Sequence, residues 1–229
     1  MERMVVLLSG GLNSVVAASR MMTNVELHFL HVDCGQAAAV AERQAAQRIC
    51  AALAGTLHVA ELPRFSGEGG AEGERADARE GAPESASSGA VRPAGAMLTV
   101  LGLGRQLALR VGAEDIICGA SEVCARADVE AGFGVESAEA RHAFFHACSI
   151  AFEMGSAMGR RLTLELPFMD ASREDIIRTG LRLGAPLHMT WSCHVSGDGP
   201  CEKCGGCRSR AAAFEALGQI DPAMAGAGR

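Results

Sequence analysis

Apolar and polar positions follow two periods along the first 62 residues. Short apolar runs with the length of buried strands alternate with stretches in which apolar residues recur every three to four positions, as on one face of a helix. Strands are expected over residues 4–8, 25–33 and 56–62, and helices over residues 14–22 and 39–54. This order of strands and helices predicts a Rossmann-like half-domain with a parallel sheet.

The same alternation resumes after residue 93. Helices are expected over residues 94–111, 139–158 and 172–183, and strands over residues 115–119 and 162–166. Ser172 precedes Asp175 by three positions, which resembles a helix N-cap, and Gly184 is a suitable C-terminal stop. The pattern therefore predicts an α/β protein, with a parallel sheet and helices on both faces over residues 1–186 and a small C-terminal lobe over residues 187–229.

A long stretch between these two halves lacks the residues that build a core. Residues 66–89 contain no Val, Ile, Leu, Met or Phe and consist mainly of Gly, Ala, Glu, Arg and Ser. Such a segment cannot bury enough apolar surface to order itself. We interpret residues 64–92 as a disordered surface insertion, with a lid over the site as the alternative.

The first expected strand ends in a turn of small residues. Residues 9–14 read Ser-Gly-Gly-Leu-Asn-Ser, and a helix is expected to begin at or near Ser14. Two consecutive glycines let the backbone approach a bulky anion because no Cβ is in the way. The N–H groups of the turn and of the helix N-terminus then point at that anion. The turn predicts a phosphate site, although it lacks the Gly-Lys-Ser/Thr of a Walker A loop, and the opening unit of any α/β domain is the alternative interpretation.

The second expected strand ends in a polar corner, Asp33-Cys34-Gly35-Gln36. Ligands of doubly wound sheets bind at the carboxyl ends of the strands, so this corner is a second candidate for ligand contacts. Cys34 lies there as well. It is interpreted either as a bystander thiol or as a nucleophile for sulfur transfer.

Composition limits the class of partner. The 229 residues carry a net charge of −6, which argues against a large nucleic-acid footprint, because such a footprint needs a basic face. No apolar run approaches the ~20 residues of a membrane span, and the chain leads directly into a strand without a signal or transit peptide. We therefore expect a cytoplasmic protein without a nucleic-acid or membrane partner.

Four of the nine cysteines are crowded near the C-terminus. The ligands of the predicted metal site are Cys193, Cys201, Cys204 and Cys207, in the spacing C-x7-C-x2-C-x2-C. Two short steps and a longer arm let one turn wrap a tetrahedral ion, and four thiolates close its coordination shell. The spacing predicts a structural zinc site, with an iron–sulfur cluster as the alternative. The basic residues Lys203, Arg208 and Arg210 are expected to offset its negative charge.

Residues 9–14 closely resemble the SGGxDS signature of the PP-loop ATP pyrophosphatases, an adenine nucleotide alpha hydrolase-like fold. Further motifs narrow the resemblance to the QueC family, the 7-cyano-7-deazaguanine synthases of queuosine precursor biosynthesis. These motifs are the corner at residues 33–36, residues 172–177, Thr-Trp-Ser-Cys at residues 190–193 and the cysteine run at residues 200–207. The resemblance covers most of the chain outside residues 64–92.

The resemblance implies an ATP-dependent C–N ligase that adenylates the carboxylate of 7-carboxy-7-deazaguanine for attack by ammonia or another amine. The product would be an amide or a nitrile. The implied cofactors are ATP, Mg²⁺ and Zn²⁺, and a homodimer or a protein partner encoded nearby is compatible with it. The implied catalytic residues are Ser9, Asn13, Ser14, Arg141 and Arg173. The implied nucleotide-binding residues are Ser9, Gly10, Gly11, Leu12, Asn13, Ser14, Asp33, Gly35 and Gln36.

Departures from the family pattern gather around the predicted ligand-binding edge of the sheet, where its strands end. In the family pattern, Asp stands in place of Asn13, Tyr in place of Cys34 and Lys in place of Arg173. The pattern also has Arg-His where this chain has residues 37–38, and an Arg-Asn pair that is missing from residues 91–96. Three alternatives follow from these changes. The chain is a ligase repurposed for another acceptor, as in a modification or antiphage system, a non-catalytic nucleotide-binding partner, or a tRNA sulfurtransferase that uses Cys34.

Overall fold

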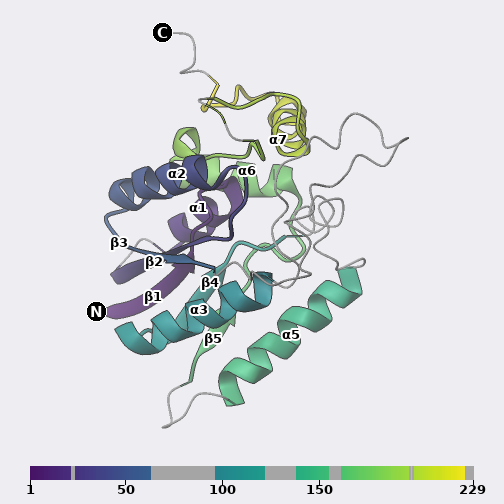
Figure 1. Cartoon of the computed structure of the whole chain (residues 1–229). Coiled ribbons are helices and arrows are strands. Elements are labelled where there is room, and N and C mark those ends of the chain that lie inside the picture. The colour runs from purple at the N-terminus through teal and green to yellow at the C-terminus, as the bar shows by residue number, and fades with distance from the viewer. Residues whose placement is uncertain are drawn as a thin grey trace, which may run out of the picture.

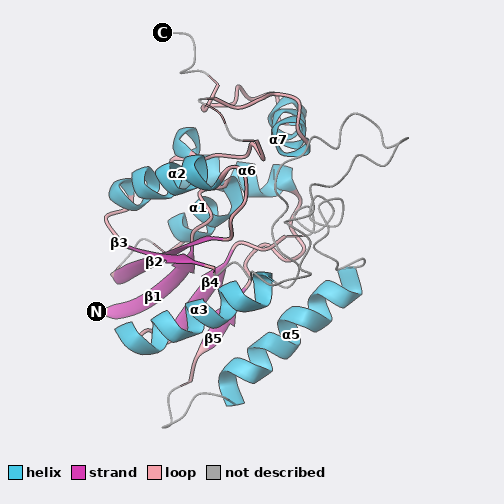
Figure 2. Ribbon diagram, viewed as in Figure 1, coloured by secondary structure: helices cyan, strands magenta, loops and turns pink. Residues whose placement is uncertain are grey.

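The computed structural model describes residues 1–21, 24–62, 96–121, 138–154, 161–195, 197 and 199–224. The insertion expected at residues 64–92 lies entirely outside them. The strands are β1 (Glu2–Leu7), β2 (Val25–Asp33), β3 (Thr56–Glu61), β4 (Asp115–Cys118) and β5 (Thr163–Glu165) (Figure 2). The helices are α1 (Leu12–Ser19), α2 (Ala39–Ala52), α3 (Ala96–Val111), α5 (Ala138–Met154), α6 (Arg173–Leu183), the 3-10 turn η2 (Leu187–Met189) and α7 (Gly205–Ala216).

All five strands are parallel and lie in the order β3-β2-β1-β4-β5. The chain adds β2 and β3 on one side of β1 and then crosses to place β4 on the other side. Val6 of β1 accordingly pairs with Phe29 of β2 and with Ile117 of β4. The strand order reverses between β1 and β4, and ligands of open parallel sheets bind outside the carboxyl ends of the strands at such a point.

Helices cover both faces of the sheet, as predicted. Helices α1, α2 and α6 lie on one face, and α3 and α5 lie on the other (Figure 1). Strand β1 is buried from both sides, with Met4 and Val6 in the cluster of the first face and Val5 and Leu7 in the cluster of the second. An unbroken apolar run is typical of such a central parallel strand.

Most element boundaries lie within a few residues of the predictions. Helix α1 begins at Leu12, two residues before the expected Ser14, so more of the glycine turn belongs to the helix N-terminus. The capping arrangement of α6 is confirmed, because Ser172 Oγ accepts a hydrogen bond from the Asp175 N–H at 3.1 Å. Gly184 closes the helix with a left-handed φ of +65°.

The C-terminal lobe shares its apolar core with the sheet domain. Leu187, Ala213 and Phe214 belong to the same buried cluster as β1, α1 and α2. The domain boundary after residue 186 stays a prediction.

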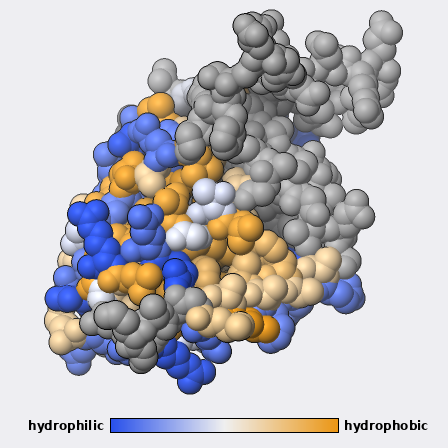
Figure 3. Space-filling model, turned by 60° about the horizontal axis from the view of Figure 1, so that its bottom comes forward, coloured by the Kyte–Doolittle hydropathy of each residue, from blue (hydrophilic) through white to orange (hydrophobic). Residues whose placement is uncertain are grey.

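Among the described helices, none combines the length and the apolar character that spanning a membrane requires. The face shown in Figure 3 mixes apolar and hydrophilic residues.

Candidate active site at the carboxyl edge of the sheet

Hydroxyl groups hold the glycine turn in shape. Ser14 Oγ donates to the Gly11 carbonyl at 3.0 Å, and Ser9 Oγ accepts from the Gly11 N–H at 3.3 Å. The two hydroxyls lie 3.2 Å apart. Helix α1 has Gly11 at its N-cap with no side-chain cap and no acidic residue in its first turn. The positive end of this helix is therefore left without an anionic side chain of its own, as an anion-binding site requires.

The structure gives Gly10 a packing role that the sequence did not reveal. Its φ is +85°, and a Cβ there would lie 2.6 Å from the carbonyl oxygen of Glu42 and 3.2 Å from Ala45 Cβ in α2. At Gly11 a Cβ would meet only Ser9 Oγ at 3.4 Å and the Trp191 carbonyl at 3.6 Å. Close packing of the turn on α2 thus demands the first glycine, whereas the second remains available for approach by a ligand.

Asn13 links the turn to the end of β4. Its amide Nδ2 donates to the Gly119 carbonyl at 3.2 Å and to Ser121 Oγ at 2.9 Å. A Cβ on Gly119 would lie 2.8 Å from the Asn13 carbonyl carbon, so the two segments are in close contact. These bonds span the point where the strand order reverses, and both use Asn13 as a donor. A carboxylate, which only accepts hydrogen bonds, could not make the contact with Gly119.

The side chains of the polar corner after β2 form hydrogen bonds within the corner and with α2. Asp33 Oδ1 accepts from the Gly35 N–H at 2.8 Å, and Gln36 Oε1 accepts from the Cys34 N–H at 2.8 Å. The buried Gln36 also donates to Glu42 Oε2 at 2.6 Å. These bonds shape the corner, and they engage the N–H groups of Cys34 and Gly35 together with side-chain oxygens of Asp33 and Gln36. Cys34 is half-buried.

Two arginines at this edge have no acidic partner in the described part of the chain. Arg141 is 6% exposed, and the Nε atoms of Arg141 and Arg173 are buried without a hydrogen-bond partner. Arg173 is the first residue of α6, which follows β5. The first turn of α5 is tied to the same end of β5, because His142 Nε2 lies 2.7 Å from Asp170 Oδ1. A buried guanidinium nitrogen without a hydrogen-bond partner is costly, and an anionic ligand would relieve that cost.

The four predicted metal ligands converge. One sulfur from each of Cys193, Cys201, Cys204 and Cys207 lies within 4.8 Å of the others. The sulfurs of Cys193 and Cys204 are 3.9 Å apart, close to the roughly 3.8 Å between thiolates of a tetrahedral site with 2.3 Å bonds. The set therefore fits a tetrahedral, thiolate-bound metal.

Backbone N–H groups surround these sulfurs. Cys193 Sγ accepts from the N–H groups of Val195 and Cys201 at 3.4 and 3.3 Å, and Cys204 Sγ accepts from the His194 N–H at 3.4 Å. The backbone N–H groups of Lys203 and Cys204 lower the pKa of the Cys201 thiol to about 6. These donors favour the thiolate form of Cys201, whereas burial raises the pKa of the Cys193 and Cys207 thiols.

Arg210 was expected to offset the charge of the cysteine cluster, and the structure pairs it elsewhere. Its guanidinium donates to both carboxylate oxygens of Asp221, at 2.5 and 2.8 Å, and to Thr190 Oγ1 at 2.7 Å. It also donates to the Leu187 carbonyl at 3.2 Å and is 6% exposed. Arg210 therefore ties α7 to the segment before the cysteines and to the C-terminal turn. No spacing in the sequence identifies Asp221 as its partner.

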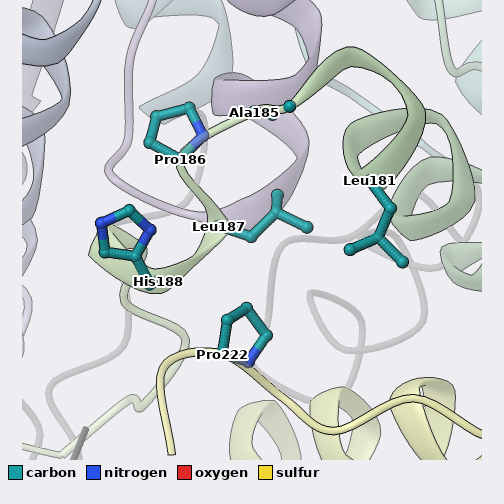
Figure 4. Close-up of a pocket in the computed structure, with 7 residues that line it drawn as sticks. Leu181, Ala185, Pro186, Leu187, His188 and Pro222 are labelled. Carbon is teal, nitrogen blue, oxygen red and sulfur yellow. The ribbon is translucent and has the colours of Figure 1, made fainter. Parts of the chain in front are cut away.

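Two pockets border the lobe. One, of about 260 Å³, is lined by Leu181, Gly184, Ala185, Pro186, Leu187, His188 and Pro222. Figure 4 shows that its labelled side chains are apolar apart from His188, so it lacks converging polar groups. The other, of about 410 Å³, lies between α2 and the lobe and is lined by Ala37, Ala38, Val40, Ala41, Gln44, Arg48, Trp191 and Gly197. The alanines at residues 37–38 stand where the family pattern has Arg-His.

The parallel sheet, the glycine turn at the reversal of strand order and the uncapped helix define an α/β nucleotide-binding protein of the PP-loop class. Comparison with known proteins narrows this class. The family model described as "Queuosine biosynthesis protein QueC" matches residues 3–218. The chain belongs to the QueC family.

Curated relatives agree with this assignment. The chain is 30% identical over 224 residues to a 7-cyano-7-deazaguanine synthase of Acidobacterium capsulatum, covering 96% of this chain and 95% of that protein. It is 32% identical over 232 residues to the enzyme of the same name from Methanoculleus marisnigri, covering 97% and 98%. Among solved structures it is similar to the U34-tRNA thiolase NcsA from Methanococcus maripaludis, with a TM-score of 0.47, 11% identity and coverage of 94% and 66%. This last likeness is too low to bear on the assignment.

Proposed function

We propose that the chain is an ATP-dependent ligase that activates the carboxylate of a 7-deazaguanine for attack by ammonia or another amine. One observation carries the proposal. The uncapped start of α1 belongs to the same carboxyl edge of a QueC-family sheet as Arg141 and Arg173, two arginines without an acidic partner among the described residues. The curated relatives are named 7-cyano-7-deazaguanine synthase.

The residues have distinct tasks in this reaction. Attack of the carboxylate on the α-phosphorus of ATP forms an acyl-AMP and releases pyrophosphate, and attack of the amine on the acyl carbon releases AMP. The N–H groups of the turn from Gly10 to Ser14 would hold the departing pyrophosphate and stabilise its developing charge. Arg141 and Arg173 would bind the substrate carboxylate or the nucleotide phosphates and fix their approach.

Two metals complete the proposal. Mg²⁺ would neutralise the phosphates, and it would be bound mainly through phosphate oxygens, because residues 9–14 contain no carboxylate. The four cysteines would hold Zn²⁺ as a closed structural site, which stabilises the lobe and takes no part in bond changes.

The direct test is incubation of the protein with ATP, Mg²⁺, 7-carboxy-7-deazaguanine and ammonium, with mass spectrometry of the products. We expect one AMP and one pyrophosphate for each amide formed, or two of each for a nitrile, because a second ATP must then activate the amide oxygen, which leaves as part of AMP. The variant Arg173→Ala should lose this activity, whereas Arg178→Ala on the exposed side of the same helix should retain it. Absence of pyrophosphate release with every amine offered would refute the proposal.

A second candidate is a nucleotide-binding protein that has lost turnover. It is favoured by Asn13, a neutral donor engaged with Gly119 and Ser121 where the family pattern has an acid. Calorimetry separates the two candidates, since ATP binding without release of pyrophosphate supports the second and turnover eliminates it.

A further inference from the structure

A short segment connects the glycine turn to the cysteine cluster. The backbone N–H of Trp191 donates to the Gly10 carbonyl at 2.9 Å. The indole N–H of the same residue donates to the Cys193 carbonyl at 2.8 Å. Cys193 is 1% exposed and is one of the four candidate metal ligands. A single residue therefore contacts the phosphate turn through its backbone and the metal site through its side chain.

The hydrogen bond from Trp191 to the Gly10 carbonyl affects the orientation of the Gly11 N–H, a candidate phosphate donor. The carbonyl of Gly10 and the N–H of Gly11 belong to one planar peptide unit, so the direction of the first sets the direction of the second. Glycine at a φ of +85° has no Cβ to restrict that unit. The hydrogen bond from Trp191 therefore restrains the orientation of the Gly11 N–H, together with the 3.3 Å bond that this N–H donates to Ser9 Oγ.

The connecting segment has little room to move. A Cβ on Gly206 would overlap the Ser192 carbonyl oxygen, so the first turn of α7 packs directly against the segment. Arg210 holds Thr190 Oγ1 at 2.7 Å and Ser192 Oγ at 3.2 Å, on either side of Trp191. A displacement of Cys193 must consequently be passed to Trp191 and to the turn.

We propose that Trp191 is a positioning residue that couples occupancy of the four-cysteine metal site to the affinity of the glycine turn for ATP. The inference rests on the proposed function in taking ATP as the ligand of the turn. With the metal bound, the four sulfurs hold Cys193, and Trp191 holds the Gly10–Gly11 peptide in the orientation that binds phosphate. Without the metal this restraint is relaxed. Linkage requires that ATP raise the affinity for the metal by the same factor by which the metal raises the affinity for ATP.

The chain supplies its own reporter of this coupling. Trp191 is its one tryptophan, and the chain has no tyrosine. Ultraviolet-excited emission at tryptophan wavelengths therefore comes from the coupling residue alone. Both ATP binding and metal removal should change this emission.

The test compares ATP binding by calorimetry in the zinc-loaded and the metal-free protein. We expect removal of zinc to weaken ATP binding by about 5- to 150-fold, the usual range of coupling between sites. We also expect ATP to slow the capture of zinc by a chelator from the folded, zinc-loaded protein. The chelator measurement starts from the zinc-loaded protein, so it remains informative even if the metal-free protein unfolds.

The variant Trp191→Phe keeps an aromatic ring and the backbone N–H but loses the indole bond to Cys193. We expect it to bind zinc and to lose the effect of ATP on zinc release. His188→Ala, an exposed position three residues earlier, should behave like the wild type. An equal effect of ATP in the wild type and in Trp191→Phe would overturn the coupling. Absence of ATP binding to the zinc-loaded wild type would instead overturn the proposed function, and the coupling with it.

Discussion

Replacing Asn13 with Asp restores the acid of the PP-loop signature, and the structure predicts a loss rather than a gain. The Asn13 amide donates to the Gly119 carbonyl and to Ser121 Oγ, and these bonds join the glycine turn to the end of β4. A carboxylate at the same position would face the Gly119 carbonyl oxygen at about the present 3.2 Å. Two acceptors would then lie against each other without a proton between them.

The size of the effect follows from these two bonds. Loss of the donor to Gly119 leaves a part-buried carbonyl unsatisfied, which costs about 1–3 kcal/mol. The Ser121 hydroxyl can turn and donate to the new carboxylate, so its bond is retained. Adding the repulsion between the oxygens, we expect the free energy of unfolding to fall by about 2–3 kcal/mol. The same perturbation should weaken binding of Mg²⁺-ATP, because it displaces the first turn of α1.

The assay is urea unfolding followed by circular dichroism, with calorimetry for Mg²⁺-ATP. Asn13→Ala is the matched control, since it removes the donor without adding a charge and should cost about 1–2 kcal/mol. Asn13→Asp should be the less stable of the two variants. An Asn13→Asp protein that is as stable as the wild type, or that binds Mg²⁺-ATP more tightly, would refute the reasoning. The carboxylate would then face the ligand instead of Gly119.

Three further predictions concern the scaffold of the site. Arg210→Ala leaves a buried carboxylate unpaired and should lower the free energy of unfolding by about 3–5 kcal/mol in urea titrations; a loss below about 1 kcal/mol would contradict its structural role. Gly10→Ala combines a positive φ with a clash against the Glu42 carbonyl and should cost about 2–5 kcal/mol, whereas Gly205→Ala, with nothing within 4 Å, should be nearly neutral; equal costs would refute the packing argument. Burial lowers the pKa of His31 below its ordinary 6.5, so the unfolded chain takes up a proton before the folded protein does. Stability should therefore fall as the pH drops below 6.5, and His31→Gln should reduce that slope in unfolding measured across pH; an unchanged slope would exclude His31 as its source.

The fold was predictable because its signals are local. Strand β1 carries one unbroken apolar run, since α1 buries it from one face and α3 from the other, and this pattern appears in five consecutive residues. The cap of α6 at Ser172 and its end at Gly184 are likewise local features. Boundaries were less accurate. Strand β5 spans only Thr163–Glu165, whereas residues 162–166 were expected.

In the candidate site, too, some features are predictable from the sequence and others are visible only in the structure. The four cysteines lie within 15 consecutive residues, so their spacing alone predicts that they can surround one ion. Arg141 and Arg173 were found through the family resemblance, and only the structure shows that their buried Nε atoms lack partners among the described residues. The pairing of Arg210 with Asp221, the bonds of Asn13 to the end of β4 and the contact of Trp191 with Gly10 carry no sequence signal.

The sequence by itself determined the order of strands and helices, the glycine turn and the cysteine cluster, because each depends on the conformational preference or spacing of residues close together in the chain. The tertiary structure alone decided that Asn13 acts as a donor, that Gly10 must accommodate α2, and that Trp191 joins the turn to the cysteine cluster. These contacts join groups 32 to 181 residues apart, from Gly10 with Glu42 to Gly10 with Trp191. Packing of the whole core, and no local preference, brings such groups within hydrogen-bonding distance.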